Sequence, residues 1–118
     1  MEEFMAVLRR EFEAEEEGSF MLKLRCELVW DRAAFSRLVR AMEQCARAYE
    51  GREQVERWVA GGFWYLEWFV PDWTSHPNFP RPHDQQYYQE ACRRLGDLAY
   101  WFFVGESPYQ GGGPLPPL

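Results

Sequence analysis

The residues best suited to chemistry lie in one proline-rich segment. Both histidines of the chain stand there, with aspartates on either side. Neutral imidazole and carboxylate groups together suit zinc or iron, and an imidazole beside a carboxylate can also transfer protons. The sequence therefore offers one candidate metal or catalytic site, made of Asp72, His76, His83 and Asp84.

The spacing of these residues argues against such a site. Patterns such as HxxxH or HExxH fix two ligands on one face of a helix, and neither occurs here. The four prolines within residues 71–82 predict a stiff, irregular loop. In that interpretation Trp73 and Phe79 anchor the loop over the core, and His76 bonds to nearby backbone. The sequence favours this structural role and gives no reason to expect a cofactor.

Glu67 is a second candidate catalytic residue because aromatic and aliphatic residues flank it in the sequence. Buried carboxylates have raised pKa values and can serve as general acids. Glycosidase-type chemistry also needs a second carboxylate about 5–10 Å away, and the sequence identifies none. The favoured alternative is an ion pair between Glu67 and Arg57, Arg93 or Arg94, or a position at the one solvent-exposed edge of the helix.

Hydrophobic periodicity predicts the helices that would position these residues. Apolar residues recur at steps of three and four, which is typical of amphipathic helices, over residues 2–17, 32–50, 52–70 and 85–103. Asp31 and Asp84 are expected helix caps, Pro71 is expected to end the third helix, and Gly105 is expected to end the fourth. That helix is apolar almost all round, so we expect it to be central and buried. A close approach by the backbone of another helix would explain Gly61 and Gly62.

Residues 20–30 follow a different pattern, because apolar and polar residues alternate there. Period two is typical of a half-buried strand, but short apolar runs also occur in helices. A lone strand would need a partner for its backbone hydrogen bonds, for instance across a homodimer. The segment fits a strand or a short helix equally well.

These elements predict an all-α fold, a compact bundle of about four long helices in a single domain over residues 1–105. Glycine and proline dominate residues 106–118, for which we expect a flexible tail. Its sequence from Pro114 to Leu118 is also that of a polyproline II ligand. Three cysteines without a CxxC pair disfavour a disulfide framework or a cysteine zinc site.

The charge of the chain is uneven. The formal net charge is −6, and residues 1–17 hold seven glutamates against Arg9 and Arg10. We expect these glutamates to form an acidic surface that attracts a basic partner, with an ordinary solubilising face as the alternative. The residues are Glu2, Glu3, Glu11, Glu13, Glu15, Glu16 and Glu17.

The same composition bears on other partners and on location. Lacking a basic stripe, the chain is not expected to bind nucleic acid directly. No apolar run is long enough to predict a membrane helix, and the acidic first residues do not resemble a secretory signal, so we expect a cytoplasmic protein. Arginine far outnumbers lysine, which is typical of GC-rich bacterial genomes.

Aromatic residues exceed what a core of this size requires, at six Trp, six Tyr and nine Phe. The cluster of Trp64, Trp68, Trp73, Tyr100, Trp101 and Phe103 could line a ligand pocket or stack on bases, but such a cluster more often belongs to the core. The surplus leaves some aromatic side chains for an exposed patch, as at protein interfaces. The favoured function is a small acidic protein-binding module that acts without catalysis. Immunity proteins, toxin neutralisers and phage-type inhibitors belong to this class. The predicted binding residues are Glu11, Glu13, Glu15, Glu16, Glu17, Trp73, Phe79 and Arg81.

Two other functions stay open on sequence grounds. One is a small enzyme or metal-binding protein that uses the His76–Asp84 loop and Glu67. The other is a homodimeric structural subunit that pairs through residues 20–30.

Overall fold

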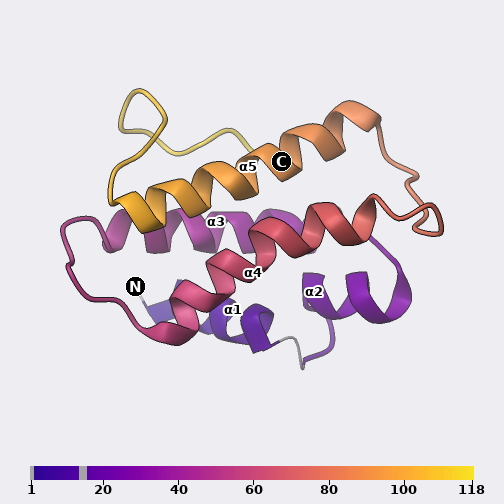
Figure 1. Ribbon diagram of the computed structural model, residues 1–118, viewed down its shortest axis with the longest axis horizontal. Coiled ribbons are helices and arrows are strands. Elements are labelled where there is room, and N and C mark those ends of the chain that lie inside the picture. Colours follow the sequence, from indigo (N-terminus) through magenta and orange to yellow (C-terminus); the bar gives the residue numbers. More distant parts are fainter. Residues whose placement is uncertain (1, 14–15) are drawn as a thin grey trace.

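Helices make up the regular structure of residues 2–13 and 16–118, the part of the chain that the computed structural model describes (Figure 1). This part of the chain contains no strand, and the predicted all-α bundle is confirmed. In chain order the elements are α1 (Glu2–Glu13), α2 (Phe20–Leu22), the π-helical turn η1 (Lys23–Glu27), α3 (Arg32–Ala48), α4 (Arg57–Thr74) and α5 (Gln85–Val104).

Short-range sequence signals set several helix ends. The Asp31 side chain accepts a hydrogen bond from the amide of Ala34 at 3.1 Å and caps α3, as predicted. Gly105 ends α5 in the left-handed region, with φ of +92°. Asp84 occupies the capping position of α5, but its side chain makes no capping hydrogen bond.

The bounds of α4 differ from the prediction at both ends. The helix begins at Arg57 because residues 52–56 form a loop, which the Tyr49 hydroxyl holds by donating to Glu56 at 2.7 Å. Pro71 lies inside the helix and does not end it. A proline in the last turn removes only one intrahelical hydrogen bond, and the amide of Ser75 still donates to the Pro71 carbonyl at 3.1 Å.

Residues 20–27, where the sequence allowed a strand or a short helix, are helical. The alternating pattern does not match burial, because Leu24 is buried whereas Cys26 and Leu28 are exposed. The structure of this segment therefore gives no support to a homodimer that pairs through a strand at residues 20–30.

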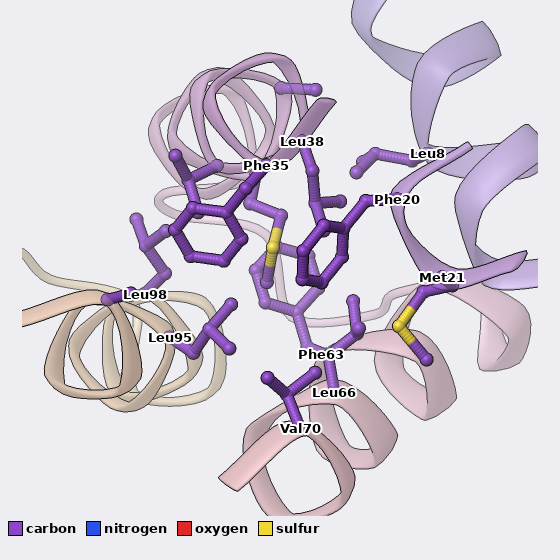
Figure 2. Packing of buried hydrophobic residues seen from close by; sticks show 14 of the residues in the cluster. Leu8, Phe20, Met21, Phe35, Leu38, Phe63, Leu66, Val70, Leu95 and Leu98 are labelled. Atoms are coloured by element: carbon purple, nitrogen blue, oxygen red, sulfur yellow. The ribbon is translucent and has the colours of Figure 1, made fainter. Parts of the chain in front are cut away.

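The core collects side chains from every helix (Figure 2). The rings of Phe63 and Phe102 stack at 4.3 Å and join α4 to α5. Trp30, just before α3, packs on Phe20 at 4.9 Å, and its indole N–H donates to the Tyr87 hydroxyl at 3.0 Å. Each fully buried aromatic or aliphatic side chain stabilises the fold by about 1.5–3 kcal/mol.

The two adjacent glycines of α4, Gly61 and Gly62, have different surroundings. A Cβ at Gly62 would overlap the ring of Phe12 on α1, so the expected backbone approach is wrong, although another helix does come close there. The approaching group is a side chain and not a helix backbone. Nothing lies within 4 Å of a Cβ at Gly61.

The whole chain measures 41 × 30 × 20 Å along its principal axes. The tail, residues 106–118, folds back along the bundle, whereas the sequence predicted a segment without packing partners (Figure 1). No helix in the described ranges is both long and apolar enough to cross a membrane.

Candidate protein-binding face

The outer surface of α4 exposes two tryptophans. Trp64 is 58% exposed and Trp68 is 42% exposed, and their ring centroids lie 5.7 Å apart. The prediction of a central, buried helix is therefore wrong, although the predicted exposed aromatic patch is present. An all-round apolar pattern cannot distinguish a helix enclosed by neighbours from one that presents aromatic side chains to solvent.

Three further aromatic rings extend this surface along α4. Tyr65, Phe69 and Trp73 stack in sequence, with centroid distances of 4.9 and 5.4 Å. Their spacing of four residues places successive rings one turn apart. Trp68 packs edge-on against both Tyr65 and Phe69. We call these side chains, Trp64, Tyr65, Trp68, Phe69 and Trp73, the aromatic face.

The aromatic face is fixed to the rest of the fold at its end. The indole N–H of Trp73 donates to the carbonyl of Leu24 in η1 at 3.0 Å. A ring held by stacking and a hydrogen bond loses little further freedom when it binds a partner.

A small hollow of about 220 Å³ adjoins Trp73, and we call it the apolar slot. One wall is Leu28, which ends η1 with a φ of +56° and is 36% exposed. A non-glycine residue in the left-handed backbone conformation destabilises the fold by roughly 1–2 kcal/mol. Backbone strain of this kind clusters at functional sites. The slot is lined by Leu28, Trp73, His76, Asn78 and Phe79.

The predicted binding residues of the loop have different environments. Trp73 is half-buried in the aromatic face. Phe79 is only 5% exposed, so it is a wall of the slot and not a projecting contact residue. Arg81 is exposed, with its guanidinium 5.1 Å from the centre of the Tyr88 ring.

Glu11 is not part of an acidic surface, which corrects its prediction as a binding residue. Its side chain is 5% exposed and accepts hydrogen bonds from the amides of Phe20 at 2.7 Å and Met21 at 3.0 Å. Burial raises the pKa of this carboxyl, and the two amide hydrogen bonds oppose that rise. Glu11 therefore joins α1 to the start of α2.

Other acidic residues of this region are exposed, namely Glu3, Glu13, Glu16 and Glu17. Two of them are paired, Glu13 with Arg9 at 3.4 Å and Glu16 with Arg10 at 3.9 Å. Glu15 and the side chain of Glu2 lie outside the described residues.

Glu67 is exposed, so the burial expected of a catalytic acid is wrong, and the position agrees with the alternative of a solvent-exposed helix edge. No ion pair among residues 2–13 and 16–118 involves it. It follows Trp64 by three residues and lies beside it on the helix surface. Its aromatic neighbours Trp64 and Trp68 are exposed together with it.

The two histidines contact separate backbone groups. His76 Nδ1 accepts from the amide of Asn78 at 3.2 Å, the backbone bond that the structural interpretation predicts. His83 Nε2 lies 3.2 Å from the carbonyl oxygen of Trp30, and Asp72 and Asp84 are exposed. Within the described ranges, no group of three or more His, Cys, Asp or Glu residues could hold a metal ion.

No family model matches the chain, and no curated protein or solved structure is significantly similar to it. Sequence reasoning missed three residues of this region, Leu28, Tyr65 and Phe69. A signal for two of them was present, since aromatic residues recur every four positions at 65, 69 and 73. The position of Leu28 beside Trp73 depends on the tertiary fold.

Proposed function

We propose that this protein binds a basic protein partner, without catalysis, through the aromatic face of α4. The observation that carries the proposal is the exposed, mutually packed pair Trp64 and Trp68. Tryptophan is enriched among the few residues that supply most of the affinity at protein interfaces. Because the rings already support one another, a partner can bury them at a small cost in side-chain entropy.

The charged residues that α4 itself places beside the aromatic face favour a basic partner, whereas Arg25 of η1 lines a hollow next to Tyr65. Glu67 and Asp72 are exposed on α4, next to Trp64 and Trp68 at helical spacing. The sequence has no arginine or lysine between Arg57 and Arg81. A guanidinium or ammonium group can therefore lie over an indole ring and pair with a carboxylate at the same site. The net charge of −6 adds long-range attraction for such a partner.

The apolar slot supports the same function. Its volume of about 220 Å³ is below the roughly 300–1,000 Å³ typical of small-molecule sites. A slot of this size suits one apolar side chain of a protein partner. The partner surface that fits best is an amphipathic helix with an apolar stripe and flanking arginine or lysine. Immunity proteins and related inhibitors of basic targets are the class of protein to which this function would belong.

Two synthetic peptides test this chemistry. Both are amphipathic helices of about 18 residues with the same leucine stripe, one with lysine and one with glutamate on the polar face. Tryptophan fluorescence follows their binding to the full chain. We expect the lysine peptide to bind at least about tenfold more tightly than the glutamate peptide.

Matched variants separate the aromatic face from general attraction to an acidic protein. Trp68→Ser is expected to weaken binding of the lysine peptide by about tenfold or more. Tyr100→Ser removes an aromatic that is 49% exposed on α5 and should leave binding unchanged. Equal losses in the two variants would contradict a binding site on α4.

A further inference from the structure

The tail follows a defined path across the helices. The hydroxyl of Tyr109 donates to Asp97 of α5 at 2.9 Å and holds the first part of the tail. Gly111 then turns the chain with a φ of +84°, a conformation that favours glycine. The remaining residues lie along α3, where Leu115 and Leu118 pack against the core.

The surface beneath this segment is a groove between α3 and α5. A hollow of about 440 Å³ remains between the tail and the helices. We call the wall residues from the two helices the α3–α5 groove, and none of them belongs to the aromatic face or the apolar slot. They are Ser36, Val39, Arg40, Glu43, Gln44, Arg47 and Arg94.

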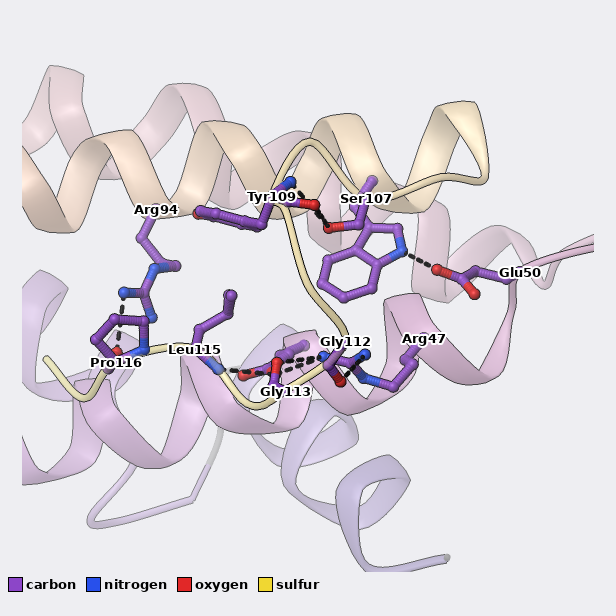
Figure 3. Close-up of polar contacts among 11 residues, drawn as sticks. Arg47, Glu50, Arg94, Ser107, Tyr109, Gly112, Gly113, Leu115 and Pro116 are labelled. Atoms are coloured by element: carbon purple, nitrogen blue, oxygen red, sulfur yellow. Dashed lines mark hydrogen bonds and ion pairs between the residues drawn. The ribbon is translucent and has the colours of Figure 1, made fainter.

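Polar side chains of the groove contact the backbone of the tail (Figure 3). Arg47 donates to the carbonyls of Gly112 at 3.3 Å and Gly113 at 3.4 Å. Arg94 donates to the carbonyl of Pro116 at 2.9 Å, and Glu43 accepts from the amide of Leu115 at 3.2 Å.

These contacts match the hydrogen-bonding pattern of a proline-rich chain. Residues 114, 116 and 117 are prolines and have no N–H group, so Leu115 supplies the single amide donor between Gly113 and Leu118. The groove offers one acceptor to that donor and arginine donors to the free carbonyls. Since recognition uses main-chain atoms, other extended segments with this pattern can make the same bonds.

Groove side chains are also held in place by groups outside the tail. Arg47 pairs with Glu43 at 2.9 Å, and its guanidinium lies 4.8 Å from the centre of the Trp101 ring. Trp101 in turn donates to Glu50 at 2.6 Å. Because α3, the turn after it and α5 supply these supports, the geometry of Arg47 and Glu43 does not depend on the tail.

We propose that the α3–α5 groove binds an extended segment of another protein that contains leucine and proline, and that this chain's own tail competes for it. Three arginines against one glutamate line the groove, so a segment with neutral or acidic flanks fits its charge. A second copy of this chain fits less well, since two molecules of net charge −6 repel each other. Gly111 to Gly113 provide the flexible link that release of the tail requires.

A labelled peptide with the sequence of residues 111–118 tests the groove in the full chain. The double variant Leu115→Ser, Leu118→Ser weakens the resident tail and keeps the wall residues. We expect the peptide to bind this variant at least about tenfold more tightly than the wild-type chain, where the tethered tail competes at an effective concentration on the order of millimolar. A peptide with alanine at its three proline positions should bind less tightly, because it lacks the preformed extended shape.

Two adjacent arginines of α5 give a matched control. Arg94→Ala in the double variant should lower peptide affinity by about tenfold, whereas Arg93→Ala removes an equal charge from an exposed position outside the groove and should have no effect. Absence of saturable binding, or equal effects of the two substitutions, would overturn the proposal.

An NMR titration of the wild-type chain does not depend on folding of the variants. Millimolar peptide should shift the Leu115 amide resonance toward its position in a free chain, together with signals of α3. A docked Leu115 resonance that the peptide leaves unchanged would refute tail release. Dimers that form by exchange of tails would assign the groove to a second copy and would also refute the proposal.

Discussion

At the scale of single residues, similar side chains take different roles according to what faces them. Glu11 is buried against two amides, whereas Glu13 is exposed and paired with Arg9. Gly62 faces the ring of Phe12, whereas Gly61 faces open space. Residue type and position along the chain are almost the same within each pair, so substitutions within a pair serve as controls for each other.

The two glycines of α4 should respond to alanine with opposite signs. We expect Gly62→Ala to lower the free energy of unfolding by roughly 1–3 kcal/mol, because its methyl group overlaps Phe12. Gly61→Ala should raise it by about 0.5–1 kcal/mol through helix propensity. Urea unfolding measures both values. Stabilisation by Gly62→Ala would show that the Phe12 ring moves aside without cost.

At the scale of elements, polar side chains join neighbouring helices across short connections. Glu11 links α1 to α2 through two backbone amides. Asp31 caps α3 and also accepts from the ammonium group of Lys23 in η1 at 2.7 Å. Short helices such as α2 are not stable alone, so these contacts are a main reason that residues 20–27 are helical.

Removing the Glu11 carboxyl should destabilise the connection between α1 and α2. We expect Glu11→Ala to cost about 2–3 kcal/mol, because two buried amides lose a charged acceptor. Glu13→Ala at an exposed position should change stability by less than about 0.5 kcal/mol. Thermal unfolding of both variants gives the comparison, and equal melting temperatures would contradict the role of Glu11 in joining α1 to α2.

Asp31 should make stability depend on acid pH. The hydrogen bond from Lys23, followed by the amide of Ala34, lowers the pKa of Asp31 below 3.8. The unfolded chain therefore takes up this proton first as the pH falls, and the contribution of Asp31 is full above about pH 4 and lost below it. In Asp31→Asn the amide side chain can still cap α3. The difference in free energy of unfolding between the wild type and this variant should therefore shrink as the pH falls from 6 to 3. A difference that does not change with pH would rule out a stabilising role for the negative charge of Asp31.

At the scale of the whole molecule, the structure separates two surfaces of different chemistry. The aromatic face of α4 has acidic neighbours, and the α3–α5 groove has three arginines. Overall charge is set by composition, but each surface presents its own local charge to a partner. Long-range attraction and close recognition can therefore be measured separately.

Association with a basic partner should be sensitive to salt. We expect the rate at which the lysine peptide binds to fall by about tenfold between roughly 20 and 500 mM salt, because screening removes attraction by the net charge. Dissociation should change little with salt and should instead become faster in Trp68→Ser. Stopped-flow fluorescence measures both rates. Replacing the exposed Glu16 and Glu17 by glutamine should reduce the salt effect, and an unaltered salt dependence would exclude steering by these residues.

Local sequence determined the helical content, the cap at Asp31 and the turn at Gly105. Periodicity and capping depend on neighbours within a few residues, so α3 and α5 were placed almost to the residue. The surplus of aromatic residues likewise predicted an exposed patch without placing it. Residues 20–30 stayed ambiguous because their helix depends on Glu11, about ten positions earlier in the chain.

Only the tertiary structure decided which side of α4 is covered. The sequence around Glu67 and Trp68 is equally compatible with a buried or an exposed face, and both residues are exposed because α4 packs through Val59, Phe63, Leu66 and Val70. The same holds for the tail, whose leucines find partners in α3 and α5 far away in sequence. Burial is a property of the contacts between elements, and those contacts are fixed when the helices pack together.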